Sequence, residues 1–187
     1  NTMGVSVSAA FAVVNRIDDF AYTPEQNIAH AMTALMAQNK GAGKIDRMKE
    51  GFRCGIILET IYGILIFIIC FALARPLMMM FVKDEEVIGH GVTYLHLISV
   101  MYLLPALTNG IQGFFRGIGD LKITLISSFI NMALRVLAAA PLVFIWKMGI
   151  EALPYSYLAG WIGMLVAETP LLLKTYKTWG KKGETPC

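Results

Sequence analysis

Residues 54–74 read CGIILETIYGILIFIICFALA, and this stretch decides the fold class. Glu59 is its only charged residue, and about 20 mainly apolar residues are what an α-helix needs to cross the hydrocarbon core of a bilayer. The run at 61–69 does not alternate between apolar and polar residues, as a strand of a membrane barrel would. The stretch therefore predicts a transmembrane α-helix, in which each backbone polar group finds its partner within the segment.

Comparable apolar segments lie on both sides of this stretch. Residues 123–146, for example, contain only Arg135 as a charged residue. The whole chain is 56% apolar and 16% charged, whereas a typical soluble protein has about 25% charged residues. We therefore expect an all-α, polytopic transmembrane helix bundle over residues 1–175, followed by a tail at 176–187. Its expected spans are 5–39, which is long and kinked, then 55–81, 92–115, 121–146 and 150–174.

Lysine and arginine residues are concentrated in alternate connections between these spans. Five lie in 40–53, two in 116–122 and four in 174–182, whereas the opposite side has only Arg75, Lys83 and Lys147. Basic connections stay in the cytoplasm, so we expect a multi-pass protein of the plasma (inner) membrane with a cytoplasmic C-terminus. The N-terminus would then lie outside without a signal peptide, and we expect that at least one preceding helix is missing.

The first span carries a stripe of polar side chains. Their spacings of three and four residues place them on one face of a helix, namely Asn15, Asp19, Tyr22, Gln26 and His30. Polar groups inside a membrane span usually face a cavity or a polar partner. We interpret the stripe as lining a substrate or ion cavity; the alternative is that Arg16, Asp18 and Asp19 lie near the outer boundary, solvated among the lipid headgroups.

Further polar residues and a proline lie next to this stripe. Asp18 and Glu25, seven residues apart, share a neighbouring face, and Arg16 is placed to pair with Asp19. Pro24 lacks an N–H group and should bend the helix, and bent helices often line transporter binding sites at the middle of the membrane.

The later spans carry fewer polar groups. Asn131 and Arg135 share a helix face and are further cavity candidates, and a central arginine needs a partner, for which Glu168 is one candidate. Pro105 and Pro141 each indicate a bend in their span. Asn109 and Gln112 follow Pro105 at helical spacing and are expected to form hydrogen bonds between helices, and Glu59 is expected to reach the membrane interface.

Several of these segments together resemble one family of transporters, the multidrug and toxic compound extrusion (MATE) family. The resemblance extends to about residue 174, and each motif is only moderately specific, but their order and spacing match well. The segments are Asn15–Phe20 with Pro24, the turn at 37–43 followed by 46–48, Pro105 with the helix end at 113–120, and the helix containing Asn131 and Arg135. The glycine-rich turns would allow close packing on the cytoplasmic side, through Gln38, Asn39, Gly41 and Gly43 in one turn and Arg116, Gly117 and Gly119 in the other.

The resemblance implies two six-helix lobes around a central cavity, of which this chain would form the eighth to twelfth helices. Its expected partners are the lipid bilayer, the missing N-terminal lobe and small amphipathic or cationic substrates. The implied activity is secondary active export of organic cations and drugs by antiport with sodium or protons, without any other cofactor. Some members couple transport through carboxylates on the seventh and tenth helices, but residues 92–115 contain no carboxylate.

Two other functions stay open at this point. A lipid-linked saccharide flippase of the same superfamily would need a larger and more basic cavity than Arg16 and Arg135 provide. A non-transporting membrane scaffold or an intramembrane enzyme would have polar groups packed against each other rather than around water. No motif of a soluble enzyme or metal site occurs, and the net charge of +3 is too small to suggest nucleic acid as a partner.

Overall fold

The computed structural model describes residues 4–149 and 151–182, with side chains up to residue 178. The described residues form helices and turns, without any strand. The all-α prediction is therefore confirmed. The helices are α1 (Val5–Gly41), α2 (Ile45–Ala72), α3 (Ala74–Met79), α4 (Glu85–Ser99), α5 (Leu103–Gly117), α6 (Leu121–Phe144) and α7 (Ala152–Lys182).

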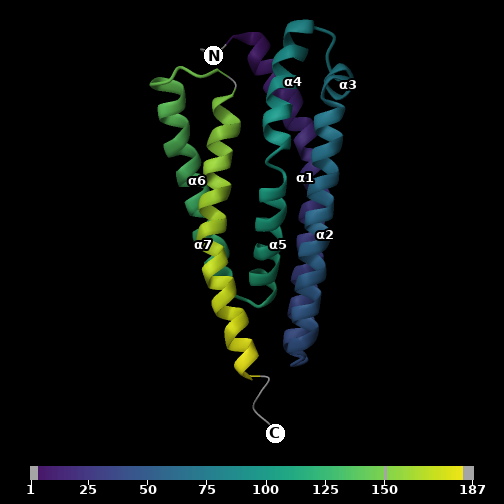
Figure 1. Cartoon of the computed structure of the whole chain (residues 1–187), viewed down its shortest axis with the longest axis vertical. Helices are drawn as coiled ribbons and strands as arrows, with labels where there is room; N and C mark the ends of the chain where they lie inside the picture. The colour runs from purple at the N-terminus through teal and green to yellow at the C-terminus, as the bar shows by residue number, and fades with distance from the viewer. Residues whose placement is uncertain (1–3, 150, 183–187) are drawn as a thin grey trace.

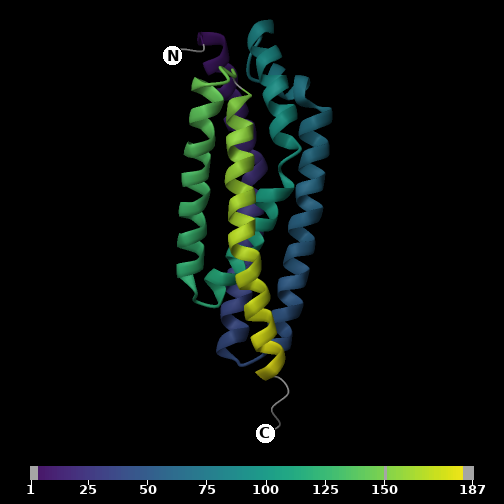
Figure 2. The same ribbon diagram turned by 60° about the vertical axis from the view of Figure 1, so that its left-hand side comes forward.

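The chain passes repeatedly between the two ends of an elongated bundle (Figures 1 and 2). Helix α1 descends in Figure 1, α2 ascends, α4 and α5 descend together, α6 ascends and α7 descends. The turn at 42–44, the turn at 118–120 and the C-terminal part of α7 therefore lie at the lower end. These are the three segments in which the sequence concentrates its basic residues, so the structure brings them to one end as expected.

Three helices are long and apolar enough to cross a membrane, namely α2, α6 and the segment Ala152–Thr178 of α7. The pair α4 and α5, bent by 50° at its break, qualifies as a fourth span when it is taken together. Helix α1 does not qualify, because charged and amide side chains recur along it. The surface agrees with a lipid environment, since Phe129 and Leu137 of α6 are 71% and 68% exposed.

Several span boundaries differ from the expected ones. Helix α2 begins at Ile45 rather than at residue 55, because Met48 and Phe52 are buried and extend its packed face toward the lower end. The expected span 55–81 is interrupted at Leu73, which separates α2 from the short α3. Helix α7 continues to Lys182, eight residues beyond the expected end of the last span at residue 174, and residues 183–187 lie outside the described part.

The third span is broken near, but not at, its proline. The break covers residues 100–102, and Pro105 lies in the first turn of α5, where a missing N–H removes no helical hydrogen bond. Pro24 and Pro141 lie inside α1 and α6, and both helices continue through them.

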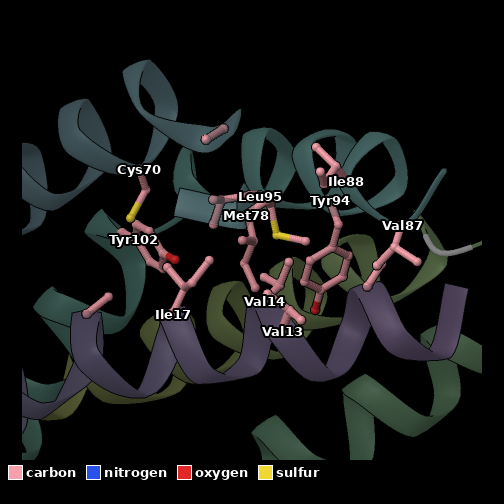
Figure 3. Close-up of a cluster of buried hydrophobic side chains, with 14 residues drawn as sticks. Val13, Val14, Ile17, Cys70, Met78, Val87, Ile88, Tyr94, Leu95 and Tyr102 are labelled. Atoms are coloured by element: carbon pink, nitrogen blue, oxygen red, sulfur yellow. The ribbon is translucent and has the colours of Figure 1, made fainter. Parts of the chain in front are cut away.

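Two clusters of buried side chains hold the bundle together. The upper cluster joins α1 to α2, α3 and α4, and Figure 3 shows Val14 of α1 directed toward Met78 and Leu95. The lower cluster joins α1 and α2 to α5. In this lower part α5 approaches α1 closely at Gly113. A Cβ atom added to this glycine would lie 2.6 Å from the carbonyl oxygen of Ala29.

Candidate functional site

A pocket of about 260 Å³ lies among α1, α5, α6 and α7. Amide and hydroxyl groups form one part of its lining, and aromatic rings form another. Its lining residues are Tyr22, Pro105, Thr108, Asn109, Gln112, Ser128, Asn131, Trp161 and Met164. Two of the candidate cavity residues, Tyr22 and Asn131, are therefore brought together here. None of the lining residues is charged.

The polar part of the pocket comes mainly from α5. Pro105, Thr108, Asn109 and Gln112 follow the spacing i, i+3, i+4 and i+7, which places them on one helix face. Thr108 donates a hydrogen bond to the carbonyl oxygen of Pro105 at 2.9 Å, so its hydroxyl group is satisfied within the helix. Asn109 and Gln112 were expected to form hydrogen bonds between helices, and for Gln112 this is confirmed, since its Nε2 group donates to the hydroxyl oxygen of Ser128 on α6 at 3.4 Å. Both residues also line the pocket.

The aromatic residues of the pocket contact one another and a further buried aromatic ring. The rings of Tyr22 and Trp161 have their centroids 6.4 Å apart, and Tyr22 also meets Tyr102 edge-on at 5.6 Å. Trp161 and Tyr102 were not among the candidates from the sequence. An aromatic residue in an apolar helix gives no local signal of whether it faces a pocket or lipid.

The structure divides the polar residues of α1 between two faces. Asp19, Gln26 and His30 are exposed, and Asn15 is only partly buried, so most of the stripe points away from this bundle. Asp18 and Glu25 point into the bundle and are buried. Arg16 is exposed as well and forms no ion pair with Asp19 within the described residues, because neither side chain is confined by packing.

Asp18 is held at the break between α4 and α5. The hydroxyl group of Tyr102, which lies in this break, donates a hydrogen bond to Oδ1 of Asp18. Tyr102 is fully buried and Asp18 is 6% exposed. The carboxylate therefore ties α1 to the irregular segment in the third span.

Glu25 of α1 and Glu59 of α2 are both completely buried. Their carboxylate oxygens have no hydrogen-bond partner among the described residues. The expectation that Glu59 reaches the membrane interface is wrong, because α2 packs against α5 at this level, where the Cβ position of Gly110 would lie 3.5 Å from Cγ of Glu59. Asn109 is the polar neighbour of Glu25 on α5.

Arg135 does not pair with Glu168, so that prediction is wrong. Its guanidinium carbon lies 3.7 Å from the centre of the Tyr157 ring, a cation–π contact. Helices α6 and α7 run antiparallel, and Arg135 lies opposite Gly160, about two turns from Glu168. Glu168 is instead buried near Ser127, Gln112 and Arg116.

The two glycine-rich turns meet at the lower end of the bundle. Lys40 Nζ donates a hydrogen bond to the carbonyl oxygen of Ile118, which joins the end of α1 to the end of α5. Gly43 and Gly119 have positive φ angles of 67° and 81°, a conformation that glycine adopts readily. The predicted close packing is observed at Gly117, where an added Cβ atom would lie 2.6 Å from the carbonyl oxygen of Thr33. It is wrong for Gly41 and Gly43, because no atom lies within 4 Å of a Cβ atom added to either. The other predicted turn residues lie at the same two helix ends, namely Gln38, Asn39 and Arg116.

The chain matches known proteins over most of its length. The model of the MatE family matches residues 1–140. The chain is 29% identical over 189 residues to "Probable multidrug resistance protein YoeA" of Bacillus subtilis, covering 97% of this chain and 39% of that protein. It is 24% identical to "Probable multidrug resistance protein NorM" of Thermotoga maritima, covering 87% of this chain and 34% of that protein.

Solved structures share the same fold. The structure described as "Crystal structure of MATE in the bent conformation" superimposes with a TM-score of 0.89 at 15% identity, over 95% of this chain and 40% of that one. An outward-facing multidrug resistance MATE family transporter gives a TM-score of 0.86 at 16% identity, over 93% and 39%. The chain thus spans about two-fifths of the length of these structures.

Proposed function

The chain belongs to the MatE family, and from this premise we propose that it forms part of a secondary efflux transporter. Members of this family are membrane transporters rather than enzymes. The proposed activity is export of small amphipathic or cationic compounds, exchanged for sodium or protons. The names of the matched relatives support multidrug export, the pocket supports the class of compound, and exchange for sodium or protons is what the family resemblance implies.

The pocket between α5 and α7 is the observation on which this proposal rests. Aromatic faces attract organic cations, and the rings of Tyr22 and Trp161 line the pocket together with the amide groups of Asn109 and Gln112. Ligand pockets commonly combine an apolar lining with a few polar groups that orient the ligand. An amphipathic compound would place its rings against Trp161 and its polar groups against α5.

The pocket argues against a lipid-linked saccharide as the substrate. Such a substrate carries phosphate groups, which proteins usually bind through arginine, lysine or backbone N–H groups. The pocket has no basic lining residue, and the guanidinium group of Arg135 is engaged with Tyr157. An uncharged pocket with nearby buried carboxylates suits a cation better than a phosphate.

The proposal also accounts for the polar residues of α1 that are exposed in this chain. Polar side chains exposed to lipid are unfavourable, so Asp19, Gln26 and His30 would face the central cavity and the N-terminal lobe. The lower end of the bundle, with its basic segments, would lie in the cytoplasm together with the C-terminus. The lipid bilayer of the plasma membrane would surround the remaining faces.

An efflux assay tests the pocket. We expect Trp161→Ala in the full-length protein to reduce dye and drug export from an efflux-deficient bacterial host, because it removes an aromatic face from the pocket. Trp146→Ala is the matched control, since Trp146 lies beyond the end of α6 and is 68% exposed. Equal export by the two variants, at equal amounts of protein in the membrane, would contradict the proposed role of the pocket.

A further inference from the structure

A second hollow, a groove of about 780 Å³, lies between the lower parts of α2 and α7 and shares no residue with the pocket. Figures 1 and 2 show these two helices approaching each other toward the lower end of the bundle. All the residues that line the groove belong to these helices, namely Lys49, Glu50, Phe52, Arg53, Ile56, Ile57, Leu172, Leu173 and Tyr176.

Contacts between the two helices fix the shape of the groove. The hydroxyl group of Tyr176 donates a hydrogen bond to the carbonyl oxygen of Lys49 at 3.3 Å. The rings of Phe52 and Tyr176 have their centroids 5.6 Å apart, and Phe52 also meets Phe114 of α5 at 4.9 Å. The groove is therefore formed before any ligand enters it, which lowers the cost of ordering the site on binding.

The upper part of the groove is apolar and open to the surroundings. Ile57 is 47% exposed and Leu173 is 56% exposed, and Ile56 and Leu172 beside them are half-buried. Both helices are long and apolar enough to cross a membrane. A hydrocarbon chain of a membrane lipid therefore fits the chemistry of this part.

The lower part of the groove is positively charged. Lys49 and Arg53 line it, and a neighbouring hollow of about 500 Å³, which shares Leu173 with it, is lined by Lys174 and Lys177. Two acidic residues lie among these four basic ones, since Glu50 lines the groove and Asp46 is 3.9 Å from Lys49. Four positive and two negative charges leave a net charge of +2.

Charged and apolar residues follow one another along the groove in the same order on both helices. Helix α2 ascends from Lys49 to Ile57, a rise of about 12 Å at 1.5 Å per residue. Helix α7 descends, so Lys177 lies about one turn below Leu173 (Figure 1). A phospholipid in the leaflet at this end of the bundle has the same polarity, with its phosphate group below and its acyl chains above.

We propose that this groove binds an anionic phospholipid, whose phosphate group contacts Arg53, Lys49 and Lys177 and whose acyl chain lies against Ile57 and Leu173. Basic pockets between transmembrane helices bind anionic headgroups, and arginine binds phosphate through paired hydrogen bonds. The net positive charge favours a lipid with net negative charge over a zwitterionic one. The lipid would join α7 to α2 on the face of α2 that looks away from α1, which passes behind α2 in Figure 1.

The experiment is native mass spectrometry of the purified full-length protein in detergent, titrated with phosphatidylglycerol or with phosphatidylethanolamine of the same acyl chains. We expect phosphatidylglycerol to bind more tightly. One basic residue near an anionic lipid contributes about 1 kcal/mol, so Arg53→Gln and Lys177→Gln should each weaken the binding of phosphatidylglycerol about fivefold. Lipid binding is measured without transport, so the result does not depend on the proposed export.

Lys122→Gln is the matched control. Lys122 is exposed and lies in the first turn of α6 at the same end of the bundle, but it does not line the groove. Its substitution removes the same charge and should leave the affinity unchanged. An equal loss from Lys122→Gln and Arg53→Gln, or equal affinity for the two lipids, would overturn the site, because general attraction to the membrane surface would then explain the binding.

A second measurement locates the lipid. Phosphatidylglycerol with a photoactivatable group on its acyl chain should label the segments 50–57 and 172–177, as read by mass spectrometry of peptides. Leu173→Trp should reduce this labelling, because the larger side chain occupies the groove. Labelling confined to other segments, or unchanged labelling in the Leu173→Trp variant, would overturn the proposal and would mean that another part of the full-length protein covers the groove.

Discussion

The hydrogen bond between Tyr102 and Asp18 predicts a measurable loss of stability. Tyr102→Phe removes only the hydroxyl group and leaves the ring in its fully buried place against Tyr22. The Asp18 carboxylate, which is 6% exposed, then loses the hydrogen bond that the structure gives it. A hydrogen bond to a charged group contributes about 1.5–3 kcal/mol to stability, and we expect the free energy of unfolding to fall by that amount.

The assay is thermal unfolding of the full-length protein in detergent, followed by its intrinsic fluorescence. Tyr155→Phe is the matched control, because it removes the same hydroxyl group from a tyrosine that is 40% exposed; its melting temperature should stay unchanged. Combining Tyr102→Phe with Asp18→Asn tests the pairing itself, since contacting residues give non-additive effects. If Tyr102→Phe lowers the stability equally in the unmodified protein and in the Asp18→Asn variant, the reasoning is refuted, because the Tyr102 hydroxyl group would then act on a group other than Asp18.

Two further predictions concern helix packing and membrane orientation. Gly113→Ala should lower the free energy of unfolding by about 1–3 kcal/mol, as overpacking does, because the added Cβ atom would lie 2.6 Å from the Ala29 carbonyl oxygen. Gly89→Ala is the control and should leave the free energy of unfolding unchanged, because no atom lies within 4 Å of its added Cβ atom. An equal loss of stability from both variants in thermal unfolding would contradict the close approach of α5 to α1. In a cysteine-free background, Lys83→Cys should react with an impermeant maleimide added to intact cells, whereas Lys44→Cys should react only after lysis, and the reverse result would invert the proposed orientation.

The sequence was sufficient to predict the helical class and the grouping of the connections, because both depend on local properties. A span such as residues 54–74 is recognisable from its length and polarity alone. Basic residues mark their side of the membrane without any knowledge of packing. The structure accordingly gathers the three basic segments at one end of the bundle (Figure 1).

The site was less predictable, because it depends on which helices pack together and in what register. Helical spacing showed that Asp18 and Glu25 share one face and that Asp19 and Gln26 share another, but not which face meets α2 and α5. The proposed Arg135–Glu168 pair failed for the same reason, since the register of α6 against α7 places Arg135 over Tyr157 instead. No sequence pattern specifies that register.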